Sequence, residues 1–288
     1  MKLCRFGERG QERPGLVDAT GTIRDLSSVL PDINPAALTP ERLAMLAQLE
    51  VTTLPAIDRG NRLGVPVANI GKFLAIGLNY ADHAREAGLE PPVEPIFFTK
   101  AISCLNGPYD DVMLPRDATK VDWEVELGVV IGTTCRYVDE EHALEHVAGY
   151  ILANDISERR FQKELGGQWD KGKGCDTFGP VGPWLVTRDE VPNPQDLSMF
   201  LDLNGERMQS GNTVTMIFGV AQCIAYVSRF VTLVPGDVLI TGTPPGVGEG
   251  RKPTPRFLRE GDELRLGIDG LGEQRQRVVA FRPTGSCP

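Results

Sequence analysis

The chain contains 288 residues, of which 41% are hydrophobic, so it can bury a large core and extensive disorder is excluded. The formal net charge is -9 and the Lys and Arg residues are dispersed, which disfavours a nucleic-acid partner. Because the longest apolar runs fall far short of the roughly 20 residues that span a bilayer, and no apolar signal segment begins the chain, we expect a cytoplasmic protein without a membrane contact.

The beginning of the chain is predicted to form a small α+β unit. Residues 2–7 and 15–26 have the pattern of short strands joined by tight turns. Residues 39–50 then have the pattern of a helix, with Thr39 as its cap and Pro40 at its first position.

The rest of the chain is predicted to form one larger domain. Residues 54–71 contain Pro and Gly without clear periodicity, so they are interpreted as a linker that divides the chain into domains at 1–70 and 71–288. Strand-like runs with a few helical patterns between them follow, which is typical of a mainly β protein of the α+β class. The runs are 73–78, 94–101, 122–132, 149–155, 199–206, 237–243, 262–268 and 275–281.

His83 is a candidate general base. It lies in a short predicted helix with Asn79 as its cap and Gly88 as its end, and Glu86, three residues later, shares its face. A carboxylate that orients an imidazole makes it a better base for water. A stabilising His–Glu pair on the surface is the alternative interpretation.

Glu124 and Glu126 are candidate metal ligands. The odd positions from Trp123 to Ile131 are apolar, whereas both glutamates belong to the other face of the predicted strand. Residues two apart on a strand lie roughly 6.5 Å apart, so their charges would repel in a partly buried site unless a cation lay between them. A solvated strand end is the alternative, and the GVVIG run that follows favours burial.

Two further histidines, His142 and His146, have the spacing of an inverted zinc-protease motif in the segment HALEH. The apolar stripe of this short helix contains Ala143 and Leu144, which leaves the histidines on a flank among glutamates. We therefore interpret them as part of a solvated face, and a five-residue match to a peptidase motif does not outweigh this.

Asp155 is a third candidate ligand. The predicted strand 149–155 ends at it, a helix is expected from near Ser157, and strand ends commonly carry binding groups. With Glu124 and Glu126 it would complete an oxygen-only set, which suits Mg²⁺ or Mn²⁺ rather than zinc. An Asx-type turn or a helix cap is the simpler explanation of a single Asp taken alone.

A Gly-rich segment from Gly167 to Gly174 contains Lys171 and Lys173. Its spacing partly matches a phosphate-binding loop, but Gly174 stands where Ser or Thr would contact magnesium, and a helix precedes it instead of a strand, so a nucleotide site is disfavoured. We expect a flexible loop that presents a cation to an anionic substrate. A mobile solvated loop with incidental lysines is the alternative.

The six cysteines are expected to be reduced thiols, most of them buried. They lack the CxxC spacing of zinc and redox motifs, and a long chain without a secretory signal rarely uses its cysteines as disulfides. They are Cys4, Cys104, Cys135, Cys175, Cys223 and Cys287.

Several segments taken together resemble the fumarylacetoacetate hydrolase family. They extend in order from about residue 73 to 281 and are IGLNYADHAREAG, EPIFFTKA, DWEVELGVVIG, GYILANDISERR, QWDKGKGCDTFGP, LNGERMQSGNTVTMIF and PGDVLITGTPPGVG. The first 70 residues resemble the small N-terminal domain of many bacterial members. This resemblance implies a mixed β-sandwich roll for the catalytic domain and a homodimer.

The resemblance also implies a role for each candidate residue. The implied ligands of magnesium or manganese are Glu124, Glu126 and Asp155. The implied catalytic groups are the lid dyad His83 and Glu86, which activates water, and Lys173, which stabilises the developing enolate. The implied substrate-binding residues are Lys100, Arg159, Gln162 and Thr243.

The implied activity is hydrolysis of a C–C bond in a 2,4-dioxo acid to pyruvate and a carboxylic acid. The length and the N-terminal unit are most similar to hydrolases of 2,4-diketo-3-deoxy sugar acids of the L-rhamnonate or L-fuconate type. Oxaloacetate decarboxylases, ureidoglycolate lyases and hydroxymuconate-type isomerases share the fold and metal set, so they stay as alternatives. A non-catalytic metal-binding module is disfavoured because His83, Glu86 and Lys173 are all present.

Overall fold

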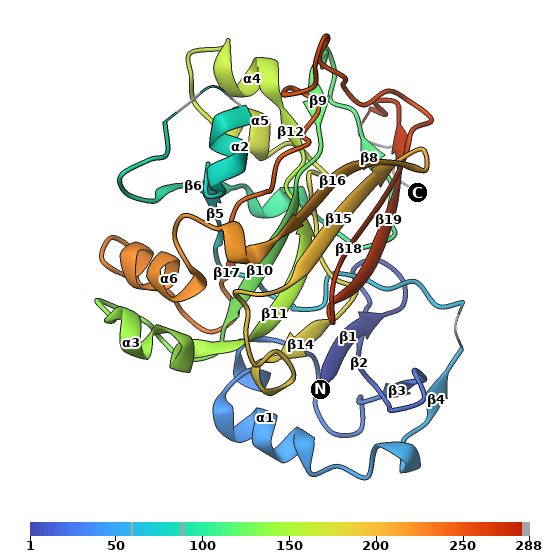
Figure 1. The fold of residues 1–288 in the computed structure, drawn as a ribbon. Coiled ribbons are helices and arrows are strands. Elements are labelled where there is room, and N and C mark those ends of the chain that lie inside the picture. Colours follow the sequence, from blue (N-terminus) through green and yellow to red (C-terminus); the bar gives the residue numbers. More distant parts are fainter. Residues whose placement is uncertain (59, 87, 89, 284–288) are drawn as a thin grey trace.

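The structure, a computed structural model, describes residues 1–58, 60–86, 88 and 90–283, and it is built around two β-sheets (Figure 1). The ten-stranded sheet has the order β4-β3-β2-β1-β14-β11-β10-β17-β5-β6. Its strands are β1 (Lys2–Phe6), β2 (Arg13–Val17), β3 (Ile23–Asp25), β4 (Ala56–Ile57), β5 (Phe73–Gly77), β6 (Ile96–Lys100), β10 (Val125–Ile131), β11 (Val147–Asn154), β14 (Leu185–Thr187) and β17 (Val238–Ile240). The mainly β, α+β class predicted from the sequence is confirmed.

The second sheet has five strands in the order β16-β15-β18-β19-β8. They are β8 (Val112–Met113), β15 (Ser198–Leu203), β16 (Glu206–Asn212), β18 (Glu263–Ile268) and β19 (Gly272–Val279). Two short pairs join β9 (Val121–Asp122) to β12 (Ser157–Glu158) and β7 (Leu105–Asn106) to β13 (Gly179–Pro180). The α-helices are α1 (Pro40–Ala47), α2 (Ala81–Glu86), α3 (Glu140–Ala143), α4 (Arg159–Lys163), α5 (Asp170–Lys173) and α6 (Val220–Ser228).

The centre of the larger sheet is the antiparallel pair β10 and β11, and every residue of both strands is buried. One side of this pair contacts strands β15, β18 and β19 of the second sheet. A strand covered on both faces reads as a nearly continuous apolar run, which is why Val129, Val130 and Ile131 follow one another. The interior is continuous, since side chains of both sheets belong to one core cluster. This core fixes the strands that carry the site.

The N-terminal strands extend the larger sheet. Strand β1 pairs antiparallel with β14, with Lys2 opposite Val186 and Leu3 opposite Leu185. As the sequence predicts, helix α1 begins after Thr39, whose hydroxyl accepts a hydrogen bond from Arg42 N at 3.3 Å. The division into domains at residue 70 stays a prediction.

Two local expectations were wrong in detail. The run 122–132 is not one strand, because Asp122 belongs to β9, which pairs with β12, whereas β10 begins only at Val125 and pairs with β11. The helix after Asp155 begins at Arg159 and not near Ser157, since Ser157 and Glu158 are used in β12 and the Glu158 carboxylate then caps the helix by accepting from Phe161 N at 2.6 Å.

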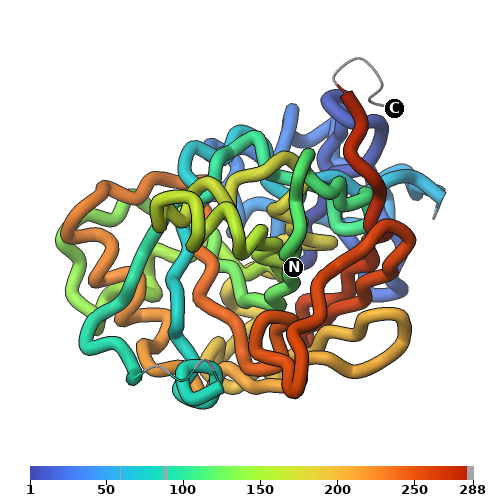
Figure 2. The backbone as a smooth tube through the Cα atoms, turned by 90° about the horizontal axis from the view of Figure 1, so that it is seen from above, coloured from blue at the N-terminus to red at the C-terminus, as the bar shows by residue number. Residues whose placement is uncertain are grey.

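The helices are short and lie around the sheets. Helix α2 lies at the periphery, near the segment that follows β17 (Figure 2). Among the described residues, no helix has the length and apolar character needed to cross a membrane.

Candidate active site

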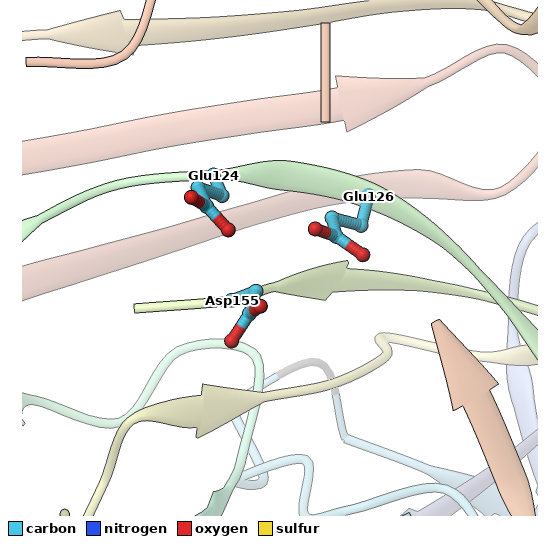
Figure 3. Close-up of side chains that lie close together, drawn as sticks. All are labelled: Glu124, Glu126 and Asp155. Carbon is cyan, nitrogen blue, oxygen red and sulfur yellow. The ribbon is translucent and has the colours of Figure 1, made fainter. Parts of the chain in front are cut away.

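Three buried carboxylates meet where β10 begins and β11 ends. Glu124, Glu126 and Asp155 can each place one oxygen within 4.8 Å of the others, and Figure 3 shows the three side chains facing one another. The pairing of β10 with β11 brings them together, because Glu126 lies opposite Ala153 and Asp155 N donates to Glu124 O at 2.8 Å. The strand-end position predicted for Asp155 is confirmed, and a solvated face for the glutamates is excluded by their burial.

Three buried cations surround two of these carboxylates. Lys173 Nζ lies 2.6 Å from Glu124 Oε2 and 2.6 Å from Asp155 Oδ2. Arg159 Nη2 lies 2.6 Å from Glu124 Oε1, and Lys100 Nζ lies 2.6 Å from Asp155 Oδ1. Burial alone would raise the pKa of Glu124, but Lys173 and Arg159 hold that pKa well below its usual range. Glu124 is therefore ionised at neutral pH.

Glu126 differs from its two neighbours. Burial raises its pKa well above the usual range, and the nearby charges of Asp155 and Glu124 raise it further, while a 2.8 Å hydrogen bond from Gly242 N opposes this only in part. Among the described residues, the ion pairs that Lys and Arg form with the triad go to Glu124 and Asp155 and not to Glu126. Carboxylate oxygens are the ligands that Mg²⁺ and Mn²⁺ prefer, so the donor set fits a hard divalent ion.

Lys173 is buried in a short helix and does not lie in a flexible loop as expected. It belongs to helix α5 and is 3% exposed, because the Gly-rich segment folds against α4. Gly172 makes this possible, since a Cβ there would lie 2.4 Å from Glu158 O. Lys171, by contrast, is exposed and donates to Leu165 O.

The predicted dyad lies over the same site. His83 Nδ1 is 3.3 Å from Glu86 Oε2, and both side chains line a cavity of about 410 Å³ together with the three carboxylates. Burial raises the pKa of Glu86, but the hydrogen bonds from His83 and Gly246 outweigh this and leave it below its usual range. A charged Glu86 can orient the imidazole for proton abstraction.

Asn79 is not the cap of α2 as predicted. Its side chain instead donates to Phe218 O and Thr241 O and accepts from Phe218 N, so it joins the start of the α2 segment to distant parts of the chain. His142 is exposed and 3.6 Å from Glu145, which confirms the solvated flank predicted for the HALEH segment.

The four predicted substrate-binding residues lie at different depths. Arg159, Gln162 and Thr243 line the cavity, and Arg159 Nη1 donates to Gln162 Oε1 at 3.2 Å. The Thr243 hydroxyl donates to Val125 O at 2.9 Å, so it also holds the strand that carries the glutamates. Lys100 lies behind Asp155 and is not among the cavity-lining residues.

Sequence reasoning missed two buried residues that support the site. Asp122 accepts from Arg159 Nε at 2.9 Å, and Gln209 accepts from Val125 N at 3.0 Å and donates to Thr243 Oγ1 at 2.8 Å. Asp122 could have been found, because it precedes Glu124 by the same two-residue step that separates the glutamates. Gln209 comes from the second sheet and carries no local signal.

The five cysteines in the described part of the chain are free thiols, and four of them are buried, as predicted. They are Cys4, Cys104, Cys135, Cys175 and Cys223, while Cys287 lies outside the described residues. Cys175 follows the short helix that carries Lys173, and burial raises its pKa to about 11, so it is a protonated thiol at neutral pH.

The chain is similar to known proteins over nearly its whole length. The model of the family described as fumarylacetoacetate (FAA) hydrolase, C-terminal, matches residues 72–279. A 2,4-didehydro-3-deoxy-L-rhamnonate hydrolase of Sphingomonas sp. (strain SKA58) is 61% identical over 285 residues, which are 99% of this chain and 98% of that relative.

Solved structures agree with this. A fumarylacetoacetate hydrolase from psychrophilic Exiguobacterium antarcticum is 36% identical, with a TM-score of 0.83 over 98% of this chain and 100% of that one. A maleylpyruvate hydrolase from Sphingobium sp. SYK-6, in complex with manganese(II) ion and pyruvate, is 32% identical, with a TM-score of 0.82 and the same coverage. The chain therefore belongs to the fumarylacetoacetate hydrolase family.

Proposed function

We propose that the protein hydrolyses the C3–C4 bond of a 2,4-dioxo acid and releases pyruvate and a carboxylic acid. The observation that carries the proposal is that a hard oxygen triad, a buried lysine and a His–Glu dyad all line or border one cavity. Each group serves a separate need of this reaction, namely substrate binding, charge stabilisation and activation of water.

The residues divide the chemistry among them. When bound, Mg²⁺ or Mn²⁺ held by Glu124, Glu126 and Asp155 supplies a Lewis acid for the 2-oxo acid. Arg159 and Gln162 lie close enough to one another to bind the substrate's carboxylate end together. Lys100 acts through Asp155, which it contacts directly.

The proton and electron movements then follow from the dyad and Lys173. His83, oriented by Glu86, takes a proton from water as the oxygen adds to C4. The C3–C4 bond breaks, its electron pair stays on the pyruvate fragment as an enolate, and the Lys173 ammonium stabilises that negative charge. The proton held by His83 is then available to C3 of the enolate, which completes pyruvate.

For the substrate, we propose a 2,4-dioxo-3-deoxy sugar acid, because the 61% identical relative is a 2,4-didehydro-3-deoxy-L-rhamnonate hydrolase. The test is pyruvate release from a panel of dioxo acids in ¹⁸O-labelled water. We expect one ¹⁸O atom in the carboxylic acid product. If the protein releases CO₂ rapidly from oxaloacetate and gives no labelled acid from any dioxo acid, the proposed hydrolase activity is wrong and the activity is that of a decarboxylase.

We also propose that the protein is a homodimer. Strand β6 is an edge strand of the larger sheet, and an apolar patch lies beside it that comprises Ile96, Phe97, Tyr226 and Phe230. Phe230 is 55% exposed although its ring stacks on Phe97 at 5.8 Å. Exposed apolar side chains next to an unpaired strand edge are typical of a surface that another copy covers.

The N-terminal residues 1–70 are proposed to be a structural domain, since the described side chains that line the cavity all come from Ile76 or later. We propose a cytoplasmic location because buried free thiols suit a reducing compartment. Cell fractionation tests the location.

A further inference from the structure

The outer part of the cavity contains an ion pair that the mechanism above does not use. Lys163 Nζ on helix α4 lies 2.5 Å from Glu249 Oε2, which belongs to the segment after β17. The same Glu249 oxygen lies 3.7 Å from Arg159 Nε. All three side chains line the cavity. Because Arg159 also contacts Glu124, it connects the inner carboxylates to this outer ion pair.

Glu249 is held in place by the backbone around it. Its N–H donates to Asp122 Oδ2 at 3.0 Å, and Gly248 N donates to Asp122 Oδ1 at 2.6 Å. Asp122 is fully buried, so the segment that carries Glu249 has a fixed anchor. This anchored segment places the Glu249 carboxylate beside Lys163 and Arg159. There it offsets the charge of cations that would otherwise attract an anion.

The cavity lining also contains two aromatic side chains. Phe98 and Trp169 lie there with their ring centroids 5.3 Å apart, and Gly77 leaves room for the indole, since a Cβ at Gly77 would lie 2.6 Å from it. The cavity thus offers aromatic rings together with a paired donor and acceptor. A hydroxyl group can both accept from Lys163 and donate to Glu249.

We propose that Glu249 is a specificity residue, which favours an uncharged, hydroxylated acyl end on the 2,4-dioxo acid over an acyl end with a second carboxylate. The inference rests on the proposed function and names the chemistry of the distal part of its substrate. A second carboxylate would meet the Glu249 charge and would have to displace it from Lys163, whereas hydroxyl groups can join the existing pair.

Lys252 also lines the cavity, and its charge alone would favour an anionic acyl end. It is exposed, so water and salt screen it more strongly than the more enclosed pair between Arg159 and Glu249. We therefore assign the discrimination to Glu249.

The test compares two substrates in wild type and in Glu249→Gln. One is a 2,4-dioxo acid with a hydroxylated acyl end, and the other is a 2,4-dioxo diacid of the same chain length. Wild type should prefer the hydroxylated substrate in kcat/KM, and Glu249→Gln should reduce that preference by about tenfold or more, because Lys163 loses its carboxylate partner and Arg159 keeps only Asp122 and Glu124. Calorimetry with the corresponding 2-oxo acids that lack the 4-oxo group should show the same change in relative affinity without any cleavage.

Two variants separate specificity from loop stability. Glu206→Gln removes a carboxylate that pairs with Arg251 and Arg256 of the same segment but does not line the cavity, so it should leave the preference unchanged. The double variant Lys163→Met with Glu249→Gln should regain part of the preference, since it also removes the cation that lost its carboxylate partner.

The outcomes are distinguishable. If Glu249→Gln lowers kcat/KM equally for both substrates and leaves their ratio unchanged, Glu249 only supports its loop and the inference is overturned. A wild-type preference for the diacid would also overturn it while leaving C–C hydrolysis intact. If wild type cleaves neither substrate, the proposed function itself fails.

Discussion

The Glu86 carboxylate accepts hydrogen bonds from the backbone N–H of Gly246, at 3.0 and 3.1 Å to its two oxygens. This contact joins helix α2 to the segment after β17, which is 160 residues away in sequence. The helix that carries the dyad is therefore docked on a segment that lines the cavity. Glu86 thus has two contacts: it pairs with His83, and it fastens its own helix to Gly246.

The contact between Glu86 and Gly246 predicts that the free energy of unfolding differs between wild type and Glu86→Gln in a pH-dependent way. The folded-state pKa of Glu86 is lowered, so its charge adds stability that is present above the unfolded pKa of about 4.3 and is lost as the pH falls through the lowered value. At pH 7 wild type should be more stable by roughly 1 kcal/mol. Urea unfolding at several pH values measures this, and a difference that stays constant down to pH 3 would contradict it.

The metal prediction concerns Glu126. Calorimetry on chelator-treated protein should show one Mg²⁺ or Mn²⁺ per chain, and Glu126→Ala should abolish this binding, because two of three carboxylates leave an incomplete shell for a hard cation. Glu145→Ala removes an exposed carboxylate far from the triad and serves as the control. Unchanged binding in Glu126→Ala would remove this residue from the ligand set.

The dyad prediction concerns catalysis without a change in binding. His83→Ala should lower the rate of C–C hydrolysis by about 10²-fold or more, the usual size of a general-base contribution. Glu86→Gln should give a smaller loss because the imidazole stays in place. Metal and oxalate affinity should be retained in both variants, and a wild-type rate in His83→Ala would require another base.

The packing prediction concerns the glycine before the buried lysine. Gly172→Ala would push α5 away from α4, because the new Cβ would lie 2.4 Å from Glu158 O, and it should cost about 1–3 kcal/mol of stability and displace Lys173. Gly60→Ala is the control, since nothing lies within 4 Å of a Cβ at Gly60. Thermal unfolding and activity together test this, and equal behaviour of the two variants would contradict it.

The association prediction uses the apolar patch beside β6. Phe230→Glu should convert a dimer to a monomer in multi-angle light scattering, because it places a charge in the middle of the stacked rings. Tyr109→Glu changes a 45% exposed aromatic residue whose hydroxyl donates to Glu273 O of β19, in the second sheet, and it serves as the control. A monomeric wild type, or a dimer that survives Phe230→Glu, would rule out this surface as the interface.

The site was largely predictable because its key residues occur in short local patterns. Glu124 and Glu126 stand two apart beside an apolar run, and Asp155 ends another, so their spacing already reflects one corner of a sheet. What the sequence could not predict depends on contacts between distant segments. From the sequence Lys173 resembles part of a mobile loop, because its burial depends on the fit of Gly172 against Glu158, 14 positions earlier.

The same limit explains the missed supports of the site. Gln209 bonds Val125, 84 positions away, and nothing near either residue in the sequence indicates that bond. Asn79 resembles a helix cap locally, yet buried polar side chains take the partners that tertiary structure offers, and here these are Phe218 and Thr241. Local pattern thus predicts the candidate site residues more reliably than the residues that hold them in place.

The pairing of β1 with β14 has a practical consequence for anyone who shortens the chain. Removing the first 70 residues would leave the buried strand Leu185–Thr187 as a bare, apolar sheet edge. Such an edge is a template for pairing between molecules, so a truncated protein should aggregate even though every residue that lines the cavity is still present. By pairing with β14, strand β1 covers an edge through which the sheets of two molecules could otherwise associate.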